Sequence, residues 1–148
     1  MKIKTLLIVN MFMALAVGTV AFARSVYYRP FLVAETIYYE ARGEGHIGMQ
    51  AVATVIYNRA KLSGQSYEYE VMKPYQFSCW NKGVKRSKPR GAAWEYAKFL
   101  QLQMENKQFE PLDTSWTHYY APRLCKPSWA AKLNEPKDIG NHRFGELK

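Results

Sequence analysis

The sequence predicts a single α+β domain that is mainly helical and carries a short β-element. Three long runs place apolar residues three and four positions apart, which is the spacing of a buried helix face. A later run alternates aromatic and β-branched residues, which favours a strand. The chain has 148 residues, 48% of them hydrophobic, so it can build one packed core but is too short for two ordinary domains.

The first 23 residues are expected to lie outside this domain. Two lysines give a basic start, residues 5–23 carry no charge, and residues 21–23 form the small-x-small pattern that signal peptidase reads. An export signal cut after Ala23 is favoured. The alternative is a weak, uncleaved membrane anchor, because the uncharged stretch just reaches the ~20 residues that span a bilayer. Either way, we expect residues 24–148 to be exported to the periplasm or cell envelope, with possible membrane association through residues 5–23.

The first two helices are expected between residues 31 and 59. Pro30 suits the first turn of a helix. Apolar residues then recur at helical spacing, at Phe31, Ala34, Ile37, Tyr38 and Ala41. Gly43 and Gly45 should stop this helix, and the next should reach Asn58-Arg59. The second helix should be largely buried through Met49, Val52, Ala53, Val55 and Ile56.

The second half of the chain mixes predicted loops with one more helix and a strand. Residues 63–89 are rich in Gly, Pro, Tyr and Lys without a helical period, so we expect loops with short strands. Residues 92–107 should form the third helix, and residues 114–120 a short strand. The inward residues of that helix should be Trp94, Ala97, Leu100 (or Phe99) and Met104. Residues 129–144 are expected to be irregular with one short helical stretch.

Charge and cysteine content narrow the range of partners. The formal net charge is +9. Outside the cytoplasm, anionic partners are wall polymers, peptide carboxylates and lipid headgroups, and nucleic acid is a less natural target. An oxidising compartment permits a Cys79–Cys125 disulfide. Closing that loop could stabilise the fold by roughly 4 kcal/mol, and two separate thiols are the alternative.

Glu40 is the strongest candidate for a chemical role. It lies near the end of the first apolar helix, so its carboxyl can point into a cleft while the helix stays fixed in the core. Its tyrosine and alanine neighbours supply an apolar wall, and such surroundings favour the protonated form that can act as an acid. Cleavage of a glycosidic bond needs that acid on the leaving oxygen. The alternative is a structural carboxylate paired with Arg42 or Arg59.

Four sequence elements, in one order along the chain, carry a family resemblance. They are Glu40-Ala41-Arg42-Gly43-Glu44; Gly48 with Ala51-Val52-Ala53 and Asn58-Arg59; Gln76-Phe77-Ser78; and Gly140-Asn141-His142 with Phe144. Together they resemble the signature of the spore-cortex-lytic and cell wall hydrolases of the SleB/CwlJ type.

The resemblance implies a lysozyme-like catalytic domain, over residues 24–148, that acts on peptidoglycan glycan strands. Family members are similar to lytic transglycosylases, which cut the bond between muramic acid and glucosamine, and some were described as N-acetylmuramoyl-L-alanine amidases. Glu40 matches the family's catalytic glutamate, which would act first as general acid and then as base. No metal or organic cofactor is implied, and we expect a monomer.

The other matched positions have weaker assignments. Gln76 and Ser78 could hydrogen-bond sugar hydroxyl or acetamido groups, or tie their own loop. Tyr119 and Tyr120 could stack on sugar faces, although core packing is the commoner role of an aromatic residue. The same choice applies to Phe77, Trp80 and Trp116. His142 could hydrogen-bond near the cleft or serve a structural role.

A second carboxylate would favour hydrolysis over transglycosylation. Glu44 and Asp113 are the candidates, but Glu44 should point elsewhere if the first helix ends at Gly43. Asn58 and Arg59 are expected to fix the second helix or to pair with Glu44. Trp116 stands where the family carries a small residue, so we expect a reshaped cleft wall.

Three other classes of protein remain open at this stage. A zinc amidase would need a ligand cluster, and the histidines are dispersed along the chain. A Cys-His peptidase could use Cys79 with His118 or His142. A non-catalytic, basic wall-binding module would need neither. The biological setting, a phage endolysin or an enzyme that remodels its own cell wall, is also open.

Overall fold

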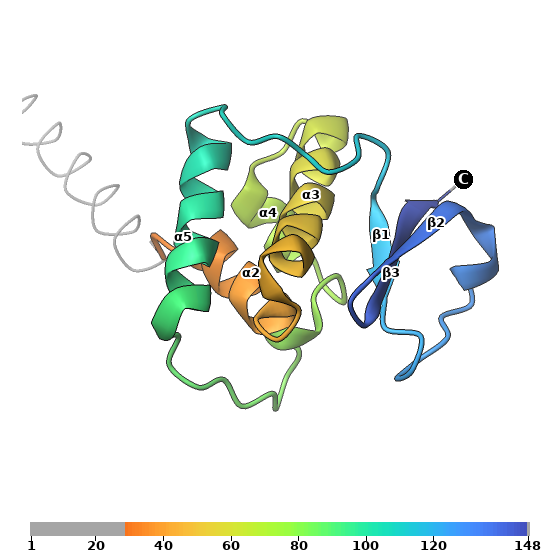
Figure 1. Cartoon of the computed structure of the whole chain (residues 1–148), viewed down its shortest axis with the longest axis horizontal. Helices are drawn as coiled ribbons and strands as arrows, with labels where there is room; N and C mark the ends of the chain where they lie inside the picture. Colours follow the sequence, from red (N-terminus) through yellow and green to blue (C-terminus); the bar gives the residue numbers. More distant parts are fainter. Residues whose placement is uncertain (1–28, 148) are drawn as a thin grey trace, which may run out of the picture. The chain divides into compact units, whose positions relative to one another are not determined.

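The computed structural model describes residues 29–147, in which four α-helices and a three-stranded sheet follow one another (Figure 1). This confirms the predicted α+β, mainly helical class. The predicted export signal or anchor lies outside the described residues. None of the helices in the described part is long and apolar enough to cross a membrane.

The first two helices form where apolar periodicity predicts them. Helix α2 spans Leu32–Ala41 and helix α3 spans Gly45–Ser63. Gly45 therefore begins the second helix instead of ending the first; its φ of +69° suits a residue without a side chain. Gly64 then ends α3 with φ of +68°, and its N–H donates to the carbonyl of Ala60.

A core of aliphatic side chains joins α2 and α3 to helix α5, which spans Gly91–Glu105. The fully buried members of this core come from all three helices and include Ala34, Ile37, Val52, Val55 and Ala97. In α5 the inward residue is Leu100, at 3% exposure, whereas Phe99 is 50% exposed. α2 therefore packs against both α3 and α5, and this packing fixes the direction of Glu40, its penultimate residue.

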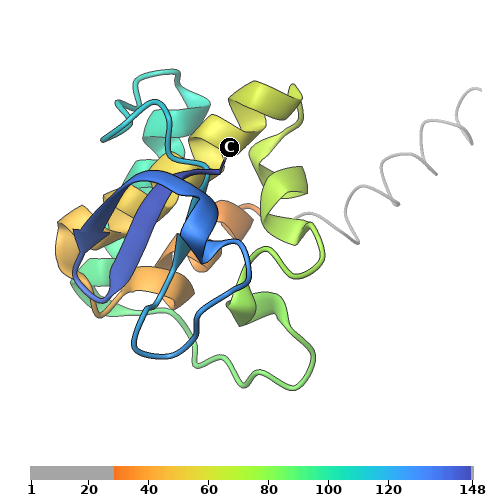
Figure 2. The same ribbon diagram turned by 90° about the vertical axis from the view of Figure 1, so that its right-hand side faces the viewer.

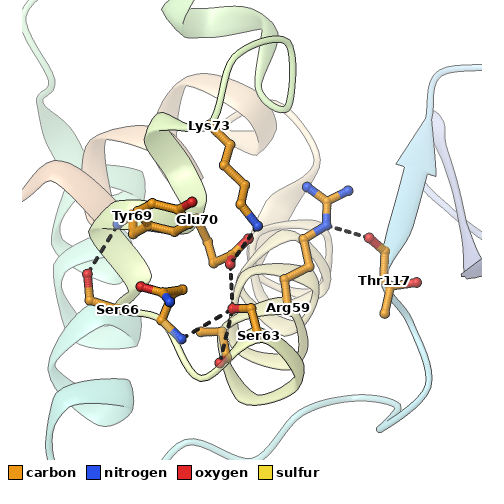
Figure 3. Close-up of polar contacts among 9 residues, drawn as sticks. Arg59, Ser63, Ser66, Tyr69, Glu70, Lys73 and Thr117 are labelled. Atoms are coloured by element: carbon orange, nitrogen blue, oxygen red, sulfur yellow. Dashed lines mark hydrogen bonds and ion pairs between the residues drawn. The ribbon is translucent and has the colours of Figure 1, made fainter.

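The segment between α3 and α5 consists of loops with two short helical pieces; the predicted loops are confirmed, and the prediction of short strands there is wrong. Helix α4 spans Tyr67–Met72, and a 3-10 turn, η1, spans Ser78–Trp80. The Ser66 hydroxyl caps α4 by accepting the N–H of Tyr69 at 3.2 Å (Figure 3). Alternating Tyr and Glu residues in α4 mimic a strand, but Glu70 turns inward and is buried.

The C-terminal segment forms a hairpin after one short helical turn; the predicted helical stretch is confirmed, and the prediction that the rest of the tail is irregular is wrong. After a short 3-10 turn, η2 (Ala130–Lys132), strand β2 (Leu133–Ile139) pairs antiparallel with β3 (His142–Leu147). Strand β1 (His118–Tyr120) pairs with the other edge of β3, which gives the order β1-β3-β2. Figures 1 and 2 place this sheet beside α3.

The sheet joins the helical core through two aromatic residues. Trp116 and Phe144 are both buried and stack with ring centroids 5.3 Å apart. The expectation that Trp116 reshapes the cleft wall is therefore wrong, because its ring packs into the core.

Candidate active site

Glu40, the penultimate residue of α2, brings together three segments of the chain. Its Oε1 accepts the backbone N–H of Cys79 at 2.8 Å and the Ser78 hydroxyl at 3.1 Å. Its Oε2 accepts the Tyr119 hydroxyl at 3.0 Å. A carboxylate that receives donors on both oxygens is held in one orientation.

The arginines that were alternative partners of Glu40 bind elsewhere. Arg42 Nη1 donates to Ser87 Oγ, and Arg59 Nε donates to the carbonyl of Thr117. The described hydrogen bonds of Glu40 thus come from neutral donors.

Helix α2 also holds the loop that supplies two of these donors. Trp80 Nε1 donates to Thr36 Oγ1 at 2.9 Å, which fixes η1 against the middle of α2. The Tyr39 hydroxyl donates to the carbonyl of Ser87 at 2.8 Å. The geometry around Glu40 therefore depends on one rigid helix and its packing.

Tyr119 supplies the third donor from the middle of β1. Its ring stacks on Phe144 at 5.3 Å and meets His142 edge-on at 5.4 Å. Burial raises the pKa of Tyr119 well above its ordinary value, and the charge of Glu40 and its hydrogen bond raise it further. The hydroxyl therefore keeps its proton and remains a donor to Glu40.

A hollow of about 650 Å³ opens beside Glu40. All the residues predicted to bind substrate line it: Gln76, Ser78, Tyr119, Tyr120 and His142. The Nδ1 atom of His142 is buried and has no hydrogen-bond partner within residues 29–147. His118 also lines the hollow, and burial, with the charge of Arg59, lowers its pKa.

The outer wall of this hollow comes from residues that the sequence analysis missed. They lie on either side of η1 and in the loop after β1, and include Tyr75, Asn81, Leu124, Pro127 and Trp129. The aromatic residues Tyr75 and Trp129 are the signal that could have indicated this wall from the sequence, because exposed rings can stack on sugars. Tyr75 is 93% exposed and has φ of +64°, a strained backbone for a residue with a side chain.

Glu44 lies outside this hollow and fastens the β2–β3 turn. Its carboxylate accepts the backbone N–H of Asn141 at 2.7 Å and the Asn141 Nδ2 at 3.0 Å. A Cβ atom at Gly48 or at Gly140 would overlap the Glu44 side chain, so both glycines leave room for it. Four of the signature residues therefore form one structural clamp: Glu44, Gly48, Gly140 and Asn141.

The Asn58-Arg59 pair holds the chain that leads into β1, and its predicted pairing with Glu44 is wrong. Asn58 Nδ2 donates to the carbonyls of Asp113 and Trp116, both at 2.8 Å. Arg59 Nε donates to Thr117 at 2.6 Å, and its guanidinium lies 5.6 Å from the centre of the Phe77 ring. The backbone before β1 is therefore tied to α3.

The predicted Cys79–Cys125 disulfide is not formed, and both thiols are free. Cys79 is buried in η1, where its N–H binds Glu40, whereas Cys125 is exposed in the loop after β1. Burial, and then the neighbouring Glu40 charge, raises the pKa of the Cys79 thiol far above its ordinary value. A thiol held in this protonated form is a poor nucleophile, which argues against a Cys-His peptidase.

Residues 29–147 contain no group of three or more His, Cys, Asp or Glu side chains placed to hold a metal ion. Phe77 and Trp116 are buried in the core, and Trp80 packs on α2, so of the predicted aromatic residues only Tyr119 and Tyr120 reach the hollow.

Known proteins are similar to this chain in sequence and in fold. Residues 43–145 match the family model described as Cell Wall Hydrolase. The fold is similar to the catalytic domain of the germination-specific lytic transglycosylase SleB from Bacillus anthracis, with 26% identity and a TM-score of 0.64 over 81% of this chain and 98% of that one.

It is also similar to the catalytic domain of the Bacillus cereus SleB protein, with 28% identity and a TM-score of 0.60 over 78% of this chain and 88% of that one. No protein of curated function matches the sequence significantly. The family match spans most of the described residues. It contains every residue of the signature except Glu40, Ala41 and Arg42. The chain therefore belongs to the cell wall hydrolase family.

Proposed function

We propose that the protein is a lytic transglycosylase that cleaves the glycan strands of peptidoglycan, with Glu40 as the one acid and base. The observation that carries this proposal is the Glu40 carboxylate on the wall of a 650 Å³ hollow, oriented by three donors. Membership of the cell wall hydrolase family and the likeness to SleB catalytic domains support the same substrate.

The first step is protonation of the glycosidic oxygen. Glu40 in its acid form gives its proton to that oxygen while the bond from the oxygen to C1 of the muramic acid residue breaks. The N-acetyl oxygen of the same sugar closes on C1 and takes up the positive charge. The donors from Ser78, Cys79 and Tyr119 stabilise the carboxylate that Glu40 has become.

The second step returns the proton. The Glu40 carboxylate removes the proton from the C6 hydroxyl of the muramic acid, O6 attacks C1, and the bond between the N-acetyl oxygen and C1 opens. The products are a 1,6-anhydromuramic end and a free hydroxyl on the other sugar. One carboxyl therefore serves both steps and is regenerated.

The lining of the hollow favours this outcome over hydrolysis. Among the described residues that line it, Glu40 is the only carboxylic acid. A hydrolase that inverts or retains configuration usually needs a second carboxyl within about 10 Å, either to activate water or to attack the sugar. Glu44 and Asp113, the two predicted candidates, do not line the hollow. Glu44 binds the β2–β3 turn, and Asp113 accepts the N–H and the hydroxyl of Ser115.

We also propose that residues 1–23 export the protein to the wall that it cleaves, as a signal cut after Ala23. N-terminal sequencing of the protein from the envelope fraction tests this. A chain that begins at Arg24 is expected, and a chain that keeps Met1 in the membrane fraction would instead indicate an anchor.

Mass spectrometry of fragments released from purified peptidoglycan tests the reaction. Anhydromuramic ends are expected. Reducing ends would indicate a hydrolase, and free stem peptides an amidase. Release of no fragments, together with binding to the wall, would indicate a non-catalytic module.

A further inference from the structure

We propose that a second hollow beside the first binds the stem peptide that branches from the glycan strand. This inference rests on the proposed function and names a binding site for a further part of the same substrate. The second hollow has a volume of about 450 Å³ and lies between α3, α4 and the end of β3.

The two hollows adjoin each other, because Arg59, Gln76 and His118 line both of them. Stem peptides are attached to the lactyl group of muramic acid, the sugar at the reacting bond. A strand bound beside Glu40 would therefore deliver a peptide to a neighbouring site.

The linings of the two hollows differ in a way that suits different ligands. Tyrosine and tryptophan rings line the first, and such rings stack on the faces of sugars. The second has no such ring among its described lining residues, and instead offers two leucines, a lysine and two glutamates besides the shared arginine. Its open apolar surface comes largely from Leu62, which is 75% exposed.

Lys73 and Arg59, the cations of the second hollow, each have hydrogen-bond donors that the described contacts do not use. Figure 3 shows the side chains of Lys73 and Arg59 near the buried Glu70, whose carboxylate accepts Lys73 Nζ at 3.0 Å and Ser63 Oγ at 2.6 Å. Glu70 is only 1% exposed, so its charge is already engaged. An ammonium has three donors, and the described contacts of Lys73 Nζ use one on Glu70.

Arg59 adds an unsatisfied donor at the junction of the hollows. Its Nη1 atom is buried and has no hydrogen-bond partner within residues 29–147, while its Nε is used by Thr117. Such a buried donor is costly unless a ligand oxygen meets it. Arg59 and Lys73 carry two positive charges against the one negative charge of the buried Glu70, so this side of the hollow has a positive charge left to bind an anion.

Glu146 supplies a negative charge to the same hollow from β3. The ligand that fits therefore carries carboxylates, an amino group and small aliphatic side chains. A peptidoglycan stem peptide has these three features: carboxylates, a diamino acid and alanines. A further stretch of glycan without peptide offers at most the lactyl carboxylates of its muramic acid residues and has no amino group to match Glu146, so it fits this lining less well.

The full-length protein can be assayed on two substrates, glycan strands that carry stem peptides and the same strands stripped of peptide by an amidase. Lys73→Gln and Glu146→Gln are each expected to raise KM on the peptide-bearing strands about fivefold, the size expected for a solvent-exposed charge contact. On the stripped strands KM should change less than twofold, and kcat should be unchanged on both. Lys137→Gln, which removes an exposed lysine of β2 outside the hollow, is the matched control.

Direct binding separates this inference from the proposed function. A free stem tetrapeptide should bind the wild-type protein, and more weakly Glu146→Gln, whether or not strands are cleaved. Wild-type protein that binds the peptide but cleaves neither strand would overturn the proposed function alone. Equal KM changes on the two substrates, or peptide binding that neither variant weakens, would overturn the stem-peptide site.

Discussion

Glu40 and Glu44 lie four residues apart in one sequence motif, yet they occupy two different regions of the molecule. Each carboxylate accepts one backbone N–H and at least one side-chain donor, from η1 and β1 for Glu40 and from the β2–β3 turn for Glu44. Glu40 opens onto a 650 Å³ hollow, whereas the half-buried side chain of Glu44 lies against Gly48 and Gly140.

The difference shows that hydrogen bonding alone does not mark a chemical role. Both carboxylates are firmly held, and what distinguishes Glu40 is the space beside it for a substrate. The turn after Ala41 separates the two functions, because it ends α2 and points the next carboxylate toward the sheet. We therefore expect a substitution at Glu40 to affect catalysis and one at Glu44 to affect stability.

The largest expected effect is that of Glu40→Gln. The amide has the shape of the carboxyl but cannot donate and recover a proton, so activity should fall by about 10³-fold or more. The temperature of unfolding should change little, because most contacts of the side chain remain possible. Solubilisation of labelled peptidoglycan measures the loss. Glu44→Gln is the matched control, and residual activity above a tenth of wild type in Glu40→Gln would contradict the assignment.

Tyr119→Phe should have the next largest effect. It removes the hydroxyl that donates to Glu40 Oε2 but keeps the ring that stacks on Phe144. A hydrogen bond to a charged group contributes about 1.5–3 kcal/mol, so kcat should fall about tenfold or somewhat more while KM stays nearly unchanged.

Tyr67→Phe is the control for this loss, because it removes a hydroxyl that bonds Met104 far along the helical core. If both variants keep full activity in steady-state assays, the Tyr119 hydroxyl has no part in the reaction. If the kcat of Tyr119→Phe falls and its unfolding temperature also falls strongly, the role of the Tyr119 hydroxyl is structural.

The sequence predicts the helices well wherever burial imposes a period. Helices α2, α3 and α5 each bury a face, and their apolar residues recur accordingly. Helix α4 has six residues and alternates Tyr with Glu, so its pattern resembles a strand; the Ser66 cap and the buried Glu70 decide the outcome. Strand β2 is largely exposed and shows no alternation, although Gly140-Asn141 is a typical two-residue hairpin turn.

The site is predicted less completely than the helices that carry it. Glu40, Ser78 and Tyr119 are recognisable from motifs, and the structure brings them into contact. The outer wall, which includes Tyr75 and Trp129, belongs to irregular segments. In such a segment, tertiary contacts decide the direction of each side chain. These segments have no periodic sequence pattern from which that direction could be predicted.

Glu44→Gln should lower stability and leave the reaction intact. The amide keeps one acceptor, but its NH₂ group then faces a donor of Asn141, so about 1 kcal/mol of unfolding free energy should be lost. Urea denaturation measures this loss. Activity at a temperature where the variant is folded should remain close to that of wild type, because Glu44 does not line the hollow beside Glu40. Glu135→Gln, at an exposed glutamate of the same hairpin, serves as control. Unchanged stability would show that the clamp contributes nothing.

The smallest expected effect is the pH dependence of the difference in unfolding free energy between wild type and Glu44→Gln. Burial by itself raises the pKa of Glu44, but hydrogen bonds from the Asn141 side chain and backbone, with the charge of His142, bring it below the ordinary value of 4.5. A carboxyl whose pKa is lower in the folded state stabilises the protein above its unfolded pKa and loses that contribution as pH falls through the folded pKa.

The difference in unfolding free energy between wild type and Glu44→Gln should therefore be full near pH 6 and shrink as pH falls from about 4.5 toward 3. Other carboxyls titrate in both proteins, so subtracting the two denaturation curves at each pH largely removes them. Glu40→Gln subtracted in the same way provides the comparison for the other carboxylate. A difference between wild type and Glu44→Gln that stays constant or grows toward pH 3 would contradict the clamp, because a carboxylate held by Asn141 must weaken its hold when it is protonated.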